Sequence, residues 1–386
     1  MSEAATNNRA ERWPVKATIV AASSLSVLAG TAVTAALPLM ETHFAETDSA
    51  AMLVRMVLTI SSLTIALCSP LAGTIVDRLG RRGPLAVGLA LFGIAGTAGY
   101  FLDSIAALLA SRVVLGIGSA LIMTSTTALI ADYYQGEARS RFIGLQAALM
   151  GFGGVLFLSG GGALAEFGWR SPFLLHGIGL LVIPAIFIFL WKSPRTSEPG
   201  IPDDAGMPWG FVAFLFTMVF VGMGCFYVML VQTPFQMAAL DISPGTSGAV
   251  MGISVLVGAI ISIFYARLKL RFRFATLQTV TFATMGIGLG LIGMAESLTA
   301  VVVGQCVLGI GLGILMPNCN LWLTVRVPAP LRGRAVGIYG TGIFLGQFVA
   351  PLATEPLVQR IGLDWTLAGL GGGLCVLALA LLAKQD

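Results

Sequence analysis

Charged side chains inside apolar stretches are rare in this chain, and the clearest case is Arg112. It interrupts the apolar run 109–118, and Arg55 stands near the start of another such run. A charged side chain in an apolar core or a bilayer is costly, and it usually serves a function. We therefore interpret Arg112 as a functional residue and Arg55 as a second candidate.

A second group of charges lies in the segment 73–83, which reads Gly-Thr-Ile-Val-Asp-Arg-Leu-Gly-Arg-Arg-Gly. Glycine permits a tight turn or the close approach of a neighbouring helix. The group comprises Gly73, Asp77, Arg78, Gly80, Arg81 and Arg82. Its simplest interpretation is that the arginines only fix the orientation of the chain in a membrane.

Other chemistries find little support in the sequence. The two histidines, His43 and His176, are too few for a metal site, and the five cysteines stand singly in apolar runs. No nucleophile–base pairing, phosphate loop or metal-ligand spacing occurs. We therefore predict a protein that is not an enzyme and that uses no metal and no cofactor.

The composition indicates which elements must position these residues. Hydrophobic residues make up 56% of the chain and charged residues only 10%, against roughly 25% charged in soluble domains. A helix needs about 20 apolar residues to cross a bilayer. The sequence predicts an all-α integral membrane protein with twelve spans, at about 15–40, 52–76, 84–102, 105–130, 141–164, 171–191, 209–235, 243–266, 274–294, 298–325, 332–355 and 364–384.

The basic residues test this map. With the N-terminus in the cytoplasm, all of the 22 lysines and arginines except Arg55, Arg112, Arg170 and Arg360 fall on the cytoplasmic side. Such a bias fixes orientation, so we expect both termini in the cytoplasm and a multi-pass protein of the cell (inner) membrane. The net charge of +4 therefore indicates topology and not nucleic acid. Bilayer lipid is the expected surrounding, and we expect a monomer.

The two halves of the chain echo each other. The run Val-Leu-Gly-Ile-Gly ends at Gly118 and again at Gly311, and Arg139-Ser-Arg141 corresponds to Arg332-Gly-Arg334 at the same offset. We predict a six-helix bundle at 1–191, a linker at 192–208 and a second six-helix bundle at 209–386. Transporters built from such repeats hold a substrate between their halves and open alternately to either side.

The segment 73–83 resembles the cytoplasmic loop motif of the major facilitator superfamily, G-x-x-x-D-R-x-G-R-R. The resemblance implies the major facilitator fold of two pseudo-symmetric bundles. It also implies a conformational latch in which Asp77 holds Arg81 and a helix N-terminus of the opposite half. Asp132, near the end of the fourth span, resembles the acidic residue that completes this cluster in family members.

Two further motifs point to the drug/proton antiporters of that superfamily. Residues 109–118 resemble the arginine motif of the fourth span, which implies a role for Arg112 in proton transfer. The fifth span resembles the antiporters' glycine-rich motif, although its proline is absent, because no proline occurs between Pro84 and Pro172. Its glycines are expected to pack against the eighth span, with Gly151, Gly154, Gly161 and Gly162 as the contacts.

The residue that would carry a proton is less evident. The first span reaches an acid only at Glu41, and the other candidates are Asp132, Glu355 and His176. We expect Glu41 and Glu355 to face the outer solvent and His176 to lie in a hydrogen-bonded core.

Spans 1, 4, 7 and 10 line the substrate cavity in the superfamily. The polar and aromatic residues there include Thr124, Phe226, Tyr227, Gln232, Gln305, Asn318, Asn320 and Trp322, with a helix break expected at Pro317. With Arg112 and Arg55 they predict an aromatic cavity with positive charge and no buried acid. Such a cavity favours a neutral or anionic amphipathic substrate.

The leading functional hypothesis is therefore a proton-driven exporter of small amphipathic molecules, such as drugs or siderophore-like metabolites. The alternative is an uptake symporter or facilitator for a small nutrient such as an organic acid or a sugar. A membrane receptor or scaffold that does not transport is a third class. A latch argues against that class, since a protein that never changes conformation has little need of one.

Overall fold

The computed structural model describes residues 11–191 and 206–383, and in these ranges every regular element is a helix. Within these described ranges, ten helical segments are long and apolar enough to cross a membrane, one of them the combined segment Ser171–Phe189, and two shorter apolar helices, Trp13–Leu28 and Arg82–Ala98, accompany them. A helix satisfies its own backbone hydrogen bonds, which a segment in lipid requires. The predicted all-α membrane fold is confirmed.

The helices of the first half show two breaks that the sequence interpretation did not contain. The first span consists of α2, a short 3-10 turn η1 and α3, and the sixth begins with the 3-10 helix η2. The elements of this half are α2 (Trp13–Leu28), η1 (Thr34–Ala36), α3 (Leu37–His43), α4 (Ala50–Leu79), α5 (Arg82–Ala98), α6 (Ile105–Tyr133), α7 (Gly136–Ala165), η2 (Ser171–Gly177) and α8 (Ile178–Phe189).

The helices of the second half are longer and more regular. They are α9 (Trp209–Ala239), α10 (Pro244–Arg271), α11 (Phe274–Gly293), α12 (Leu298–Arg326), η3 (Ala329–Leu331), α13 (Arg332–Ile361) and α14 (Leu363–Ala383). The expected break at Pro317 was wrong, because Pro317 lies inside the continuous helix α12. Most of the predicted linker, residues 192–205, lies outside the described residues.

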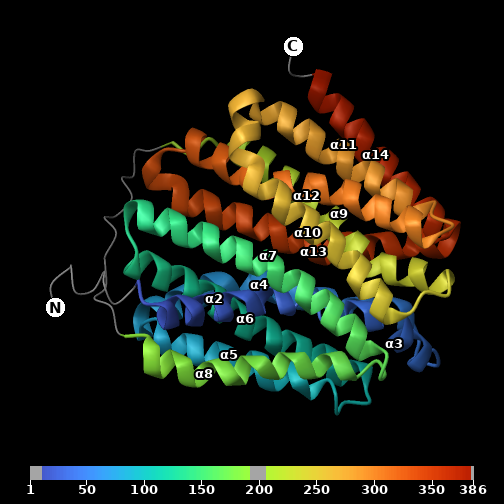
Figure 1. Ribbon diagram of the computed structural model, residues 1–386, viewed down its shortest axis with the longest axis horizontal. Helices are drawn as coiled ribbons and strands as arrows, with labels where there is room; N and C mark the ends of the chain where they lie inside the picture. Colours follow the sequence, from blue (N-terminus) through green and yellow to red (C-terminus); the bar gives the residue numbers. More distant parts are fainter. Residues whose placement is uncertain (1–10, 192–205, 384–386) are drawn as a thin grey trace.

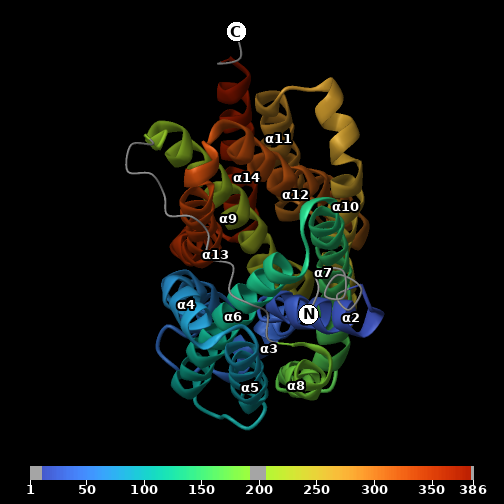
Figure 2. The same ribbon diagram turned by 90° about the vertical axis from the view of Figure 1, so that its left-hand side faces the viewer.

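The two halves form separate layers. In Figure 1, helices α9–α14 lie above α2, α5, α6 and α8, and α7 runs along the boundary. The closest contacts between the layers join α7 to α10 and α4 to α13, and Figure 2 shows both pairs from the end of the molecule. We call the end that carries the turn between α4 and α5 the inner end, since the sequence predicts it to be cytoplasmic, and the opposite end the outer end.

Glycines allow α7 to approach α10 and the first span. A Cβ atom at Gly162 would lie 2.6 Å from the carbonyl oxygen of Pro244, and one at Gly161 would lie 2.0 Å from that of Ala32. At Gly154 the nearest atom would be Val255 Cγ1 at 3.2 Å, and at Gly151 it would be Ala259 Cβ at 3.3 Å. Gly151, Gly154 and Gly162 therefore lie against α10, whereas Gly161 lies against the turn of the first span and not against the eighth span. The tightest contacts lie towards the outer end.

This geometry predicts opposite effects for two neighbouring glycines of α7. Gly162→Ala places a methyl group against the backbone of α10, and overpacking of this kind costs about 1–3 kcal/mol. Gly160 faces open space, so Gly160→Ala should be neutral or stabilise the helix by up to about 1 kcal/mol. Thermal unfolding of both variants in detergent measures the difference, and equal melting temperatures would contradict the close contact.

Candidate functional site

A buried ion cluster joins the two halves near the outer end. The guanidinium group of Arg55 on α4 lies 2.8 Å from Glu41 Oε2 at the end of α3 and 2.6 Å from Glu355 Oε2 on α13. Its carbon Cζ lies 4.2 Å from the ring centroid of Phe235 on α9. The side chains of Arg55 and Glu355 are each only 4% exposed. A single arginine thus holds a carboxylate from each half.

The expectation that Glu355 faces the outer solvent was wrong. Its carboxylate is buried because Arg55, which comes from the other half, supplies the opposite charge that an ionised group needs away from water. Glu41 is 34% exposed and so connects the cluster to the outer surface. The fully buried amide of Gln232 on α9 contacts Glu355 as well. Glu355 is therefore a functional candidate that the sequence interpretation left at the surface.

Two further polar contacts close the outer half of the interface. The hydroxyl group of Ser62 on α4 donates to Gln347 Oε1 on α13 at 2.9 Å. The backbone N–H of Gly245 at the start of α10 donates to Glu166 Oε1 beyond the end of α7 at 2.8 Å. Hydrogen bonds from the Ser243 hydroxyl and from Gly245 lower the pKa of the Glu166 carboxyl below its ordinary value. Both helix pairs at the interface are thus bonded to each other towards the outer end.

At the inner end, the latch residues bond within their own half. Arg81 lies 2.8 Å from Asp77 and 3.1 Å from Asp132, and it also donates to the carbonyl oxygen of Val76. Asp77 is 72% exposed, and a Cβ atom at Gly73 would meet nothing within 4 Å. Arg82 donates to the carbonyl oxygen of Phe187 on α8. The implied contact of Asp77 with a helix of the opposite half is not formed in this conformation among the described residues.

A cavity of about 520 Å³ lies between the halves in the inner part of the molecule. Small residues and methionines of α7, α9, α10 and α12 line it, and none of the lining residues is charged. They are Gly144, Ala147, Ala148, Gly151, Met223, Val255, Gly258, Ala259, Ser262, Ile263, Leu312, Gly313 and Met316. The polar contacts at the outer end and this cavity together describe a conformation that is open towards the inner end.

Arg112 lies inside the first half and away from this cavity. Its guanidinium group donates to the carbonyl oxygens of Gly96 at 2.8 Å and Ala95 at 3.2 Å, and it stacks 4.8 Å from the ring centroid of Phe173. His176 Nε2 lies 3.5 Å from it. Both Arg112 and His176 are fully buried. Carbonyl oxygens and an aromatic face take the place of an acidic partner for this charge.

The predicted cavity residues are dispersed, and none of them lines the inner cavity. Asn318 bonds to Tyr265 and Gln278 within the second half, and Gln305 approaches Thr233. Trp322 packs against Phe211, Phe214 and Phe274. Tyr227 and Gln232 are buried, Thr124 and Phe226 are half-buried, and Asn320 is exposed.

The residues that do line the cavity were missed because they are apolar. One signal was available in the sequence, since Gly144, Ala147, Ala148 and Gly151 recur at the spacing of a single helical face. A stripe of small residues on a membrane helix marks a surface where a partner or a cavity lies close.

Comparison with known proteins identifies the family. The sequence profile of the Major Facilitator Superfamily matches residues 19–351. The chain belongs to this superfamily. Quinolone resistance protein NorA of Staphylococcus aureus is 24% identical over 310 residues, which cover 77% of this chain and 78% of NorA. The probable vesicular acetylcholine transporter-B of Danio rerio is 37% identical over 136 residues, 34% of this chain and 28% of that protein.

Solved structures of major facilitator proteins share the fold. A D-xylose-proton symporter superimposes with a TM-score of 0.78 at 16% identity, over 96% of this chain and 97% of that one. The human organic anion transporter MFSD10 superimposes with a TM-score of 0.70 at 20% identity, over 96% and 99% of the two chains. The protein is therefore a multi-pass membrane transporter with the major facilitator fold.

The ion cluster predicts an order of damage among three variants. Arg55→Gln leaves two carboxylates without a counter-charge and should cost about 3–5 kcal/mol. Glu355→Gln should cost less, because Arg55 keeps Glu41, and Arg55→Gln with Glu355→Gln should recover part of the loss. Thermal unfolding in detergent ranks the variants. Arg170→Gln, which breaks the more exposed pair with Asp103, is the control and should cost about 1 kcal/mol or less.

The Glu166 contact predicts a dependence on pH. A carboxyl group whose pKa is lowered in the folded protein adds stability above its unfolded pKa and loses it as the pH falls through the folded pKa. The native protein should therefore melt at a higher temperature than Glu166→Gln at neutral pH, and the two should converge in acid. A difference that persists unchanged at the lowest pH would show that ionised Glu166 does not support the contact.

Proposed function

We propose that this transporter exports small amphipathic molecules by alternating access, in exchange for protons. The observation that carries the proposal is the uncharged cavity between the halves, open towards the inner end. A cavity of about 520 Å³ has the size of typical small-molecule sites. The similarity to NorA and the glycine contacts between α7 and α10 support export.

During the transport cycle, the contacts between the two halves must break at the outer end and new contacts between them must form at the inner end. To open outward, the protein must separate Arg55 from Glu355 and Glu166 from Gly245. The same movement brings the inner ends of the two halves together. Asp77, exposed here, then becomes available to the opposite half, in the role that the latch motif implies. Rigid movement of one bundle against the other is a common form of such transitions.

The substrate follows from the lining of the cavity. Arg112 is enclosed by its own half and Arg55 is neutralised, so the predicted positive charge does not reach the cavity. The cavity has no acidic lining residue either, because the buried Glu355 lies in the ion cluster with Arg55 and not in the cavity. We therefore propose neutral molecules with a large apolar surface, and the anionic alternative loses its support.

Proton coupling has candidates but no assigned carrier. Glu41 is the partly exposed acid of the outer cluster, while Arg112 and His176 form the buried pair of the first half. We propose that the coupling residue is one of these three or Glu355, whose buried carboxylate pairs with Arg55. The protein would act as a monomer in the cytoplasmic membrane, with both termini in the cytoplasm.

Uptake of a small nutrient is the second candidate. The missing proline in α7 and the absence of an acid from the first span before Glu41 favour it. A symporter needs the same two conformations, so direction depends on which of them binds substrate and proton together.

An accumulation experiment tests the proposal. Bacteria that lack their major pumps and overproduce the protein should accumulate less of a neutral lipophilic dye, and a protonophore should abolish the difference. Ala147→Trp, which fills the cavity, should restore accumulation to the level without the protein, while Ala380→Trp on the exposed face of α14 should not. Higher accumulation of any compound than in cells without the protein would replace export by uptake.

A further inference from the structure

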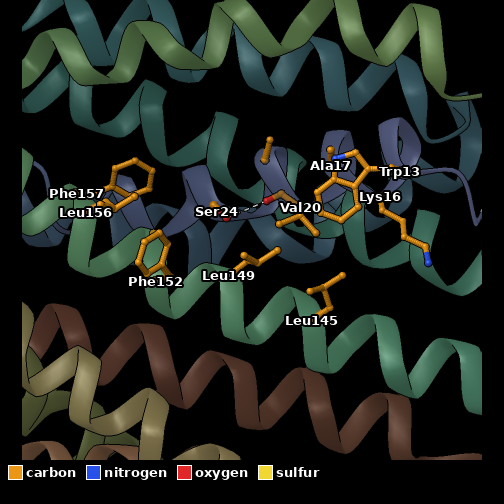
Figure 3. Close-up of a pocket in the computed structure, with 12 residues that line it drawn as sticks. Trp13, Lys16, Ala17, Val20, Ser24, Leu145, Leu149, Phe152, Leu156 and Phe157 are labelled. Carbon is orange, nitrogen blue, oxygen red and sulfur yellow. Dashed lines mark hydrogen bonds between the residues drawn. The ribbon is translucent and has the colours of Figure 1, made fainter.

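A groove of about 330 Å³ runs along the outside of the first half between α2 and α7. Figure 3 shows Trp13 and Lys16 at one end of it and Phe152, Leu156 and Phe157 towards the other. Trp13, Phe152 and Leu156 are each more than half exposed. On a membrane-spanning protein, apolar side chains exposed in this way face the lipid.

The groove has the length of one lipid tail. From Leu145 to Phe157 the helix α7 rises about 18 Å, and one leaflet contributes about half of the roughly 30 Å hydrocarbon core. An apolar groove of this size does not hold water stably, and an unfilled one forfeits the contacts of its lining atoms. An acyl chain therefore fits both its length and its chemistry.

A polar cavity of about 110 Å³ continues the groove at the inner end. The two share Lys16 and Leu145, and the cavity adds Arg141, Tyr134 and Glu11. Lys16 is ion-paired with Glu11, and Arg141 lies 2.8 Å from the exposed Glu137. Of the side chains that line this cavity, Lys16 and Arg141 are basic and Glu11 is acidic. Two further basic residues, Arg12 and Arg139, lie within four residues of them along the chain.

We propose that the groove and cavity together bind one anionic phospholipid of the leaflet at the inner end. One acyl chain lies along α7, the phosphate group meets Lys16 and Arg141, and Trp13 marks the level of the headgroups. Basic pockets between membrane helices at this level bind anionic headgroups, and tryptophan prefers the interface. Glu11 competes with the phosphate for Lys16, so the charge of this one side chain lowers the affinity for the lipid.

The test measures lipid retained by the full-length protein. Purified protein is exchanged into mixed micelles with equal amounts of phosphatidylglycerol and phosphatidylcholine of identical chains, and the bound lipid is determined by mass spectrometry. We expect phosphatidylglycerol to be enriched and Lys16→Gln to lower its retention about fivefold. Glu11→Gln should raise it, which failure to fold cannot imitate. Arg271→Gln, at the inner end of α10, is the control and should change nothing.

A second pair of variants tests the tail. Ala17→Leu fills the groove and should lower the retention of both lipids, whereas Ala380→Leu on the lipid face of α14 should lower neither. Equal retention of the two lipids, or a loss with Lys16→Gln no greater than with Arg271→Gln, would overturn the headgroup site. An unchanged retention in Ala17→Leu would overturn the tail site. Neither result bears on the direction of transport.

Discussion

The interior of a bilayer offers no water to a buried charge, and the protein's charges are arranged around this constraint. Each one within a span is enclosed by protein that compensates it. Arg55 lies between two carboxylates, and Arg112 lies among carbonyl oxygens and an aromatic ring. Compensation of the first kind crosses between the halves and depends on conformation. Compensation of the second kind stays within one half and can persist while the halves move.

This difference explains how the same helices can be closed against each other at the outer end and separated at the inner end. At the outer end, a buried Glu355 carboxylate is stable only while Arg55 pairs with it. The halves therefore close at this end only when the ion pair forms. At the inner end, Arg81, Asp77 and Asp132 already form ion pairs within their own half in this conformation. The cavity between α7 and α10 is lined by uncharged side chains of both halves, and the small ones among them leave room for a small molecule.

The fold could be predicted from the sequence because hydropathy, charge bias and the half-length repeat are independent signals that agree. The short 3-10 turns in the first and sixth spans could not, since they depend on packing rather than on local apolarity. Glu355 was misplaced because its partner Arg55 lies 300 positions away, and no local pattern reports that contact. The cavity was sought among polar residues, yet those residues satisfy one another inside each half, as Asn318 does with Tyr265 and Gln278.

The two halves of the repeat differ in charge at one buried position. Arg112 and Gln305 occupy corresponding positions at the same offset, and both side chains are fully buried. The neutral amide of Gln305 approaches Thr233, whereas the charge of Arg112 draws in two backbone carbonyls and His176. If the two halves were only a symmetric scaffold, the surroundings of Arg112 and of Gln305 would have no reason to differ. Keeping a charge at one position and an amide at the other places the buried Arg112–His176 pair in the first half, with no counterpart at Gln305.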